Sequence, residues 1–246
     1  MSDTLIFAIP SKGRLMESCA EALAKAGIVV RKNGPERGYR GEIEGVSGVE
    51  VAFVSASEIE RHLRSGEAHL GITGRVLIED YIDDWASKVD FVHTFDFGPA
   101  DVVVAVPNYW LDVHAMADLE DIVVAFRRKH RRRLRVATKY MNLTRKFFAA
   151  HDVASYRIVE SLGATEGAPA AGSADLIVDI TTTGETLRAN GLRILEDGVI
   201  LKSNACLVRA TQPSRNGIAG MAEAELLRRL GGYFSGSAQA VRRDLR

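Results

Sequence analysis

Short apolar runs alternate with helical patterns along most of this 246-residue chain. Seven runs have the length and composition of buried strands: 5–9, 49–54, 69–73, 102–106, 134–137, 157–159 and 176–180. Most are separated by segments in which apolar residues recur at helical spacing. This alternation predicts a chain of the α/β class, built from layers of helices on sheets.

Local signals predict where several helices begin and end. A helix after the first strand is predicted by four apolar residues on one face: Leu15, Cys19, Leu23 and Ala26. Gly27 follows as a C-terminal stop. Ser57 and Glu60 have the spacing of a capping box, and Asn142 is a candidate N-cap for a later helix.

Composition excludes several classes of function. The 32 basic and 32 acidic residues cancel, so no overall charge favours nucleic acid or a membrane surface. Cys19 and Cys206 stand far apart and outside any zinc-binding spacing, which argues against a disulfide framework or a zinc site. The first residues contain no basic leader and no long apolar run, so we expect a cytoplasmic protein.

The segment 126–135, FRRKHRRRLR, is the strongest basic run of the chain, with seven Lys or Arg residues. It resembles a nucleic-acid-binding patch, but it lacks interleaved aromatic residues on which bases would stack. Leu119, Ile122, Val123 and Phe126 lie upstream on one helical face. We therefore predict the solvated end of an amphipathic helix, whose C-terminal dipole the cations complement, and no nucleic-acid partner.

A candidate phosphate-binding turn lies at 175–190, DLIVDITTTGETLRAN. Leu176, Ile177 and Val178 predict a strand buried on both faces, and Asp179 follows it directly. Hydroxyls and unhindered N–H groups then stand at the start of a predicted helix, where an anion is favoured: Thr181, Thr182, Thr183, Gly184 and Thr186. The turn fits a ribose 5-phosphate, with Asp179 accepting from sugar hydroxyls. A strand that merely leads into an N-capped helix has the same pattern.

Two further segments have features of ligand-binding loops. Lys12, Gly13 and Arg14 stand where the first strand gives way to the first helix. Cations there oppose the helix dipole, which favours a role with a polyphosphate over a purely solvated one. In HLGITG, glycines near a strand end allow close approach of a ligand to the backbone, and the candidates are Gly71, Thr73 and Gly74.

Nine positions around the turn resemble the signature of the ATP phosphoribosyltransferase family: Glu166, Gly172, Ala174, Ile177, Asp179, Thr183, Gly184, Thr186 and Leu187. IPSKGRLMES, HLGITG, DFGPADVVVAVP and ATKYMNLTRKFF also look like blocks of that family. The length resembles the short form, which works with a separate histidyl-tRNA-synthetase-like regulatory subunit. The resemblance also implies a homodimer within a hetero-oligomer.

The resemblance implies a two-lobed fold like that of type II periplasmic binding proteins, with the ligand cleft between the lobes. Crossings near Ala100 and Gly191 would assign residues 1–100 and 192–246 to lobe I. Residues 101–191 would form lobe II and carry the phosphate loop.

The resemblance also implies the first reaction of histidine biosynthesis, in which N1 of the ATP adenine displaces pyrophosphate from phosphoribosyl pyrophosphate (PRPP), with Mg²⁺. The implied catalytic residues are Lys12, Arg14, Arg37 or Arg40, Glu166 and Asp179. The implied PRPP site is Asp179, Thr182, Thr183, Gly184, Glu185 and Thr186. The implied ATP site is Lys12, Gly13, Arg14, Gly71, Thr73 and Gly74.

Two alternatives stay open from the sequence. A type I phosphoribosyltransferase also leads from a strand through acids into a Thr/Gly turn, but it usually has two adjacent acids. Here Val178 and Ile180 flank a lone Asp179. A two-lobed small-molecule binding or sensor protein is the non-enzymatic alternative, because a fold does not determine a function.

Overall fold

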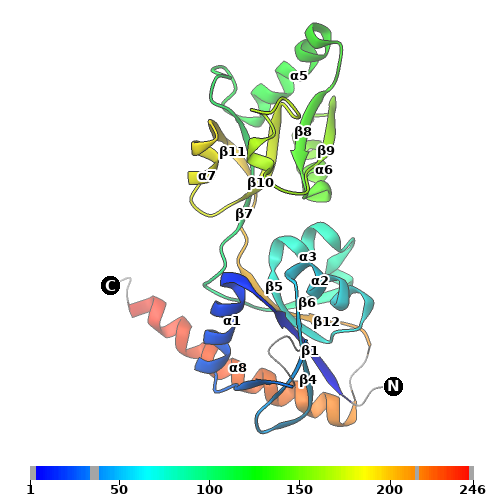
Figure 1. The fold of residues 1–246 in the computed structure, drawn as a ribbon, viewed down its shortest axis with the longest axis vertical. Helices are drawn as coiled ribbons and strands as arrows, with labels where there is room; N and C mark the ends of the chain where they lie inside the picture. Colours follow the sequence, from blue (N-terminus) through cyan, green and yellow to red (C-terminus); the bar gives the residue numbers. More distant parts are fainter. Residues whose placement is uncertain (1–3, 34–38, 214–215, 244–246) are drawn as a thin grey trace. The chain divides into compact units, whose positions relative to one another are not determined.

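The computed structural model describes residues 4–33, 39–213 and 216–243. The chain forms two compact units, each with its own sheet (Figure 1). Unit 1 comprises Met1–Ile78, Ile82–Gly98 and Asn204–Arg246, and unit 2 comprises Glu79–Tyr81 and Pro99–Ser203. The predicted two-lobed α/β class is therefore confirmed.

Unit 1 contains a seven-stranded sheet in the order β2-β3-β4-β1-β5-β12-β6. Its strands are β1 (Leu5–Pro10), β2 (Val30–Lys32), β3 (Arg40–Ile43), β4 (Val46–Val54), β5 (Leu70–Gly74), β6 (Val89–Thr94) and β12 (Ala205–Ala210). β1 is parallel to both β4 and β5, whereas β12 is antiparallel to β5 and β6. Its helices are α1 (Gly13–Lys25), α2 (Ala56–Ser65), most of α3 (Arg75–Tyr81), α4 (Trp85–Lys88) and α8 (Gly217–Arg243).

Both faces of this sheet are buried, as the continuous apolar runs predict. Phe7 of β1 belongs to a core that includes Leu23 of α1 and Leu226 of α8. The neighbouring Ala8 belongs to a second core, which includes Ile59 of α2. Successive side chains of β1 thus alternate between two helical layers.

Unit 2 contains a five-stranded sheet in the order β11-β7-β10-β8-β9. Its strands are β7 (Asp101–Pro107), β8 (Leu134–Thr138), β9 (Tyr156–Glu160), β10 (Leu176–Thr181) and β11 (Leu192–Leu201). β10, β8 and β9 run parallel, and β7 is antiparallel to β10 and β11. Its helices are α5 (Met116–His130), α6 (Met141–Ala150), α7 (Glu185–Ala189) and a 3₁₀ turn, η1 (Thr165–Gly167).

All seven strands predicted from apolar runs are present, and the first three residues of β10 have no exposed surface. The prediction that the chain returns to lobe I at residue 192 is wrong. Leu192 pairs with Pro107 and Ile194 with Ala105, so β11 extends the sheet of unit 2. The chain leaves unit 2 only after Ser203.

Two predicted helix caps are also wrong. α2 begins two residues early, because the Ser55 hydroxyl accepts from the Glu58 N–H at 3.3 Å and Glu58 accepts from the Ser55 N–H at 2.8 Å. α6 has Tyr140 at its N-cap. The Asn142 side chain instead donates to the Asp80 carbonyl oxygen at 2.8 Å.

Candidate functional site

Three helices of unit 1 begin at one edge of its sheet. β1, β4 and β5 are parallel neighbours, so their carboxyl ends lie together, and α1, α2 and α3 start there. Lys12 is the N-cap residue of α1, while Gly13 has φ +76° and Arg14 is exposed. α1 has neither a side-chain cap nor an acid in its first turn. This edge therefore combines the uncapped start of α1 with two cations and favours an anion.

The predicted HLGITG candidates divide into packing residues and one edge residue. Gly71 is buried, and a Cβ added to it would lie 2.7 Å from Ile59 Cγ2. Thr73 is fully buried, with its hydroxyl donating to the Ala56 carbonyl oxygen at 3.1 Å. These contacts hold α2 against β5. The hydroxyl of Thr73 and the absence of a side chain at Gly71 are therefore explained by the packing of the helix on the strand. Gly74 is the N-cap of α3 and lies at the anion-favouring edge.

The two loop arginines have different outcomes. Arg40 begins β3, is exposed and forms an ion pair with Glu50. Its charge is thus partly compensated in this structure. Arg37 lies outside the described residues.

Unit 2 gathers its predicted site at the carboxyl edge of three parallel strands. Asp179 lies on β10, Lys139 follows β8, and the loop after β9 leads to Thr165 and Glu166 in η1. Because β10, β8 and β9 are neighbours in this order, these groups come together although they lie far apart in sequence. Contacts between β10 and η1 agree with this arrangement.

The environment of Asp179 makes ionisation unfavourable. Burial raises the pKa of its carboxyl group, and the nearby Glu166 carboxylate raises it further. The Ile180 N–H, which donates to Asp179 Oδ1 at 2.8 Å, opposes the rise, as do the Lys139 cation and the Thr165 hydroxyl. A half-buried carboxylate beside a second acid is suited to a cation or to hydroxyl donors.

The turn after β10 holds itself together through its threonines. Thr181 Oγ1 accepts the Gly184 N–H at 2.9 Å, and Thr183 Oγ1 lies 3.4 Å from the Glu185 N–H. The Thr182 hydroxyl donates to the Pro99 carbonyl oxygen at 2.9 Å. Gly184 has φ +73°, which suits glycine and turns the chain into α7. A phosphate bound here would replace contacts of the turn with its own oxygens.

Two residues at the carboxyl edge of the unit 2 sheet, Thr165 and Tyr140, were not predicted from the sequence. Thr165 is 3% exposed and lies beside Asp179, after Ala164 with its positive φ of 44°. Tyr140 is 2% exposed; burial raises the pKa of its hydroxyl, and the Asp179 charge adds to the rise. No local motif marks either residue, since both depend on the packing of β8, β9 and β10.

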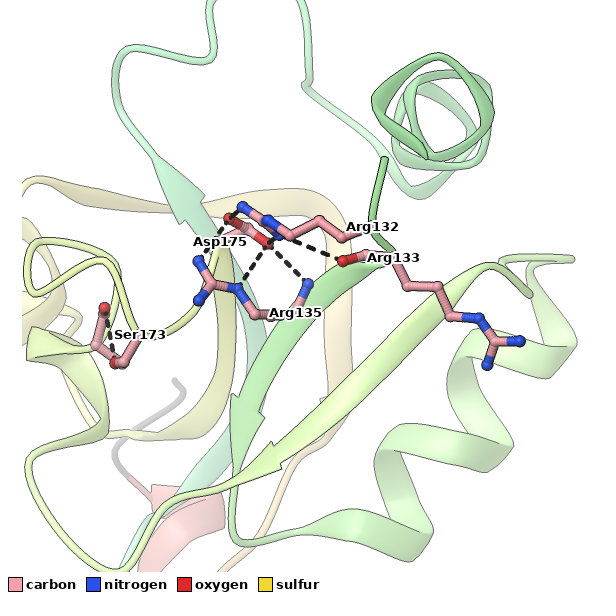
Figure 2. A network of polar contacts seen from close by, with 6 residues as sticks. Arg132, Arg133, Arg135, Ser173 and Asp175 are labelled. Atoms are coloured by element: carbon pink, nitrogen blue, oxygen red, sulfur yellow. Dashed lines mark hydrogen bonds and ion pairs between the residues drawn. The ribbon is translucent and has the colours of Figure 1, made fainter. Parts of the chain in front are cut away.

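A second acid, Asp175, directly precedes β10 and has a different environment. Asp175 Oδ1 accepts from Arg132 Nη2 at 2.8 Å, and Oδ2 accepts from the Arg135 N–H at 2.8 Å (Figure 2). Burial alone would raise its pKa, but the hydrogen bonds from Arg132 and Arg135 lower it to about 2. Asp175 therefore joins β10 to the start of β8 and is occupied by structural contacts.

No group of three or more His, Cys, Asp or Glu residues that would hold a metal ion occurs in the described part of the chain. Asp179 and Glu166 supply two carboxylates, so a divalent cation there would need further oxygen ligands from substrate or water. Within the described ranges, no helix is long and apolar enough to cross a membrane.

Two α/β units with anion-favouring strand-to-helix turns define a two-lobed protein of the type II periplasmic-binding-protein class. Residues 55–231 match the family model described as ATP phosphoribosyltransferase. Over 212 residues, the chain is 57% identical to an ATP phosphoribosyltransferase of Rhodopseudomonas palustris (strain BisA53), covering 86% of this chain and 65% of that protein. Over 205 residues, it is 58% identical to one of Mesorhizobium japonicum, covering 83% and 88%. The chain belongs to the ATP phosphoribosyltransferase family.

Solved structures agree on the fold. The ATP phosphoribosyl transferase (HisG:HisZ) complex from Thermotoga maritima has a chain with TM-score 0.71 at 24% identity, covering 95% of this chain and 100% of that one. An ancestral arginine-binding protein bound to arginine has TM-score 0.55 at 14% identity, covering 97% and 94%. The matched segment spans less than two thirds of the R. palustris relative and most of the M. japonicum relative.

Proposed function

We propose that this chain transfers the phosphoribosyl group of PRPP to N1 of the ATP adenine, giving N1-(5-phosphoribosyl)-ATP and pyrophosphate. The family membership supports the reaction. The observation that carries the residue assignment is the carboxyl edge of unit 2, where Asp179 meets the threonine turn.

In this proposal the turn from Thr182 to Thr186, which is exposed except at Gly184, binds the 5-phosphate of PRPP through N–H groups and hydroxyls. Asp179 and Glu166 accept from the ribose hydroxyls or hold its Mg²⁺. Adenine N1 is already a neutral nucleophile, so the protein has to align the reactants and stabilise charge. A cationic C1 develops as pyrophosphate departs, and the neighbouring carboxylates stabilise it.

Lys12 and Arg14 are proposed to bind the phosphate groups of ATP or of the leaving pyrophosphate at the edge of unit 1. The start of α1, which has no side-chain cap and no acid in its first turn, supports this assignment. Gly13 and Gly74 belong to the same edge. Arg40 is a further candidate for pyrophosphate, provided that the ligand displaces Glu50 from it.

Mg²⁺ is proposed as the cofactor, held by Asp179, Glu166 and substrate oxygens. The pairing of two acids beside one lysine supports it. Burial raises the Asp179 pKa and repulsion from Glu166 adds to the rise, and a divalent cation relieves that repulsion. The metal would neutralise charge on the pyrophosphate as it leaves.

The test compares Asp179→Ala with Asp175→Asn, which alters a carboxylate just before the start of the strand that carries Asp179. Each variant is incubated with ATP, PRPP and Mg²⁺, and phosphoribosyl-ATP is quantified by chromatography and mass spectrometry. We expect D179A to lose at least about a hundredfold in turnover, as typical for a group that stabilises transition-state charge, and D175N to retain activity. Near-normal turnover of D179A would remove Asp179 from the mechanism.

We also propose a cytoplasmic, hetero-oligomeric enzyme whose homodimers work with a histidyl-tRNA-synthetase-like regulatory subunit. The protein of similar fold from Thermotoga maritima forms a HisG:HisZ complex, which supports such a partner. Histidine should then inhibit the assembled enzyme and not this chain alone. Strong inhibition of the isolated chain by histidine would contradict this division of labour.

A further inference from the structure

Helix α5 carries charges that the proposed reaction does not use. Its buried face consists of Met116, Leu119 and Val123. Its exposed side contains Glu120, Asp121, Val124, Arg127 and Arg128. Each of the four charged residues is three or four positions from Val124, so the five side chains form one stripe along the helix. We call this stripe the outer face of α5.

The outer face is charged with opposite signs at its two ends. Two acids precede Val124 by four and three residues, and two arginines follow it by three and four. Each acid is therefore six to eight residues from each arginine, roughly 9–12 Å along the axis, which is too far for a contact within the helix. Among the residues that the structure describes, none of these four charges forms an ion pair. Val124 is 53% exposed between them.

This pattern is complementary to itself. Consider two copies of this helix packed antiparallel about a two-fold axis at Val124. A residue that precedes Val124 in one copy then faces the residue that follows Val124 by the same number of positions in the other copy. Glu120 then lies opposite Arg128 of the second copy, and Asp121 lies opposite Arg127. All four pairs are attractive, and the two Val124 side chains meet at the centre. A two-fold interface requires this kind of self-complementary patch.

We propose that the outer face of α5 binds the outer face of α5 in a second copy of this chain, antiparallel and centred on Val124. A nucleic acid fits the face less well, because Glu120 and Asp121 would repel phosphates along the same stripe. The aromatic ring nearest to the cations, Phe126, is stacked on His130 and lies under Arg132, so it offers no platform for a base.

The segment that directly follows α5 holds the end of this helix in place. Arg132 and Arg135 are held by Asp175, and the chain leaves α5 through Arg131 in the left-handed region at φ 53° (Figure 2). The turn after α5 is thus anchored to β8 and β10. The interface made by one helix from each copy is small, so we infer a weak, salt-sensitive contact.

Site-specific crosslinking tests the pairing directly. Val124→Cys lies on the proposed axis, whereas Ala125→Cys is also exposed but points to a different side of the helix. Both native cysteines are buried. Under mild oxidation we expect V124C to form an interchain disulfide several-fold faster than A125C. Equal rates for the two variants would overturn the proposal.

Charge reversal in the V124C background gives an independent check. E120R/D121R makes the whole face positive and R127E/R128E makes it negative, so each variant alone should crosslink about tenfold more slowly. An equal mixture should restore fast crosslinking, with one copy of each variant in the product. Failure of the mixture to recover, with both variants folded by circular dichroism, would refute the antiparallel register. Crosslinking measures association alone, so its result is independent of the proposed activity.

Discussion

Replacing Asp175 by asparagine removes a carboxylate that both Arg132 and Arg135 contact. Burial raises the pKa of Asp175, but these partners outweigh burial and bring it from an ordinary 3.8 to about 2. A shift of this size corresponds to roughly 2.4 kcal/mol of native-state stabilisation at neutral pH. Because the Arg132 side chain is 38% exposed, solvent screening reduces this figure. We expect Asp175→Asn to cost about 1–2 kcal/mol in free energy of unfolding.

The contribution of Asp175 to the free energy of unfolding depends on pH in a defined direction. A folded-state pKa below the unfolded value means that the stabilisation is present above pH 3.8 and is lost as the pH falls through about 2. Urea unfolding of wild type and D175N should therefore differ at pH 7 and converge as the pH falls below 3.8. A gap that stays constant down to pH 3, or no gap at pH 7, would refute the reasoning.

Glu225→Gln is the matched control for this experiment. Hydrogen bonds from Arg228 and Arg229 also lower the Glu225 pKa to about 2, but the three residues lie on one helix, three and four positions apart. Intrahelical pairs at this spacing contribute little to stability. E225Q should therefore change the unfolding free energy less than D175N does.

Two further predictions concern the candidate sites. Asp179→Asn should raise the thermal unfolding temperature at pH 7, because burial raises the Asp179 pKa and ionisation then costs stability above that pKa. The gain should begin to shrink as the pH falls through the folded-state pKa and should vanish below the ordinary pKa of 3.8. A D179N protein no more stable than wild type at pH 7 would contradict the burial argument. Gly71→Ala should destabilise by about 1–3 kcal/mol, since its Cβ would lie 2.7 Å from Ile59 Cγ2 and 3.1 Å from Leu63 Cδ1. Gly163→Ala, where a Cβ meets nothing within 4 Å, is the control, and equal denaturation midpoints for the two would refute the packing role of Gly71.

Much of the local structure was predictable from sequence. The apolar run 176–178 is buried on both faces, and α1 begins at Gly13 with its predicted apolar face inward. The turn from Thr181 to Gly184 also has its predicted position between strand and helix. Each of these features depends on residues within a few positions of one another, so periodicity and turn chemistry were enough.

The strand pairings were not predictable in the same way. The runs 192–195 and 205–208 look equally suited to the first sheet, yet β11 joins β7 and only β12 joins β5. The strands β2, β3 and β6 were not predicted at all, because they are short or irregularly alternating. Which partner a strand takes depends on whether its surface fits that of another strand, and the two strands can lie roughly a hundred residues apart in the sequence.

The sequence by itself determined the α/β class, the strand-to-helix turns and the chemical types that stand there: lysine and arginine at one, acid and threonines at the other. Only the tertiary structure decided that Asp179 lies half-buried beside Glu166 while Asp175, four residues earlier, is held by two arginines. Only packing, too, assigned Gly71 and Thr73 to the contact with α2. The physical reason is that burial and pKa arise from neighbours in space, and the order of strands in the sheet chooses those neighbours.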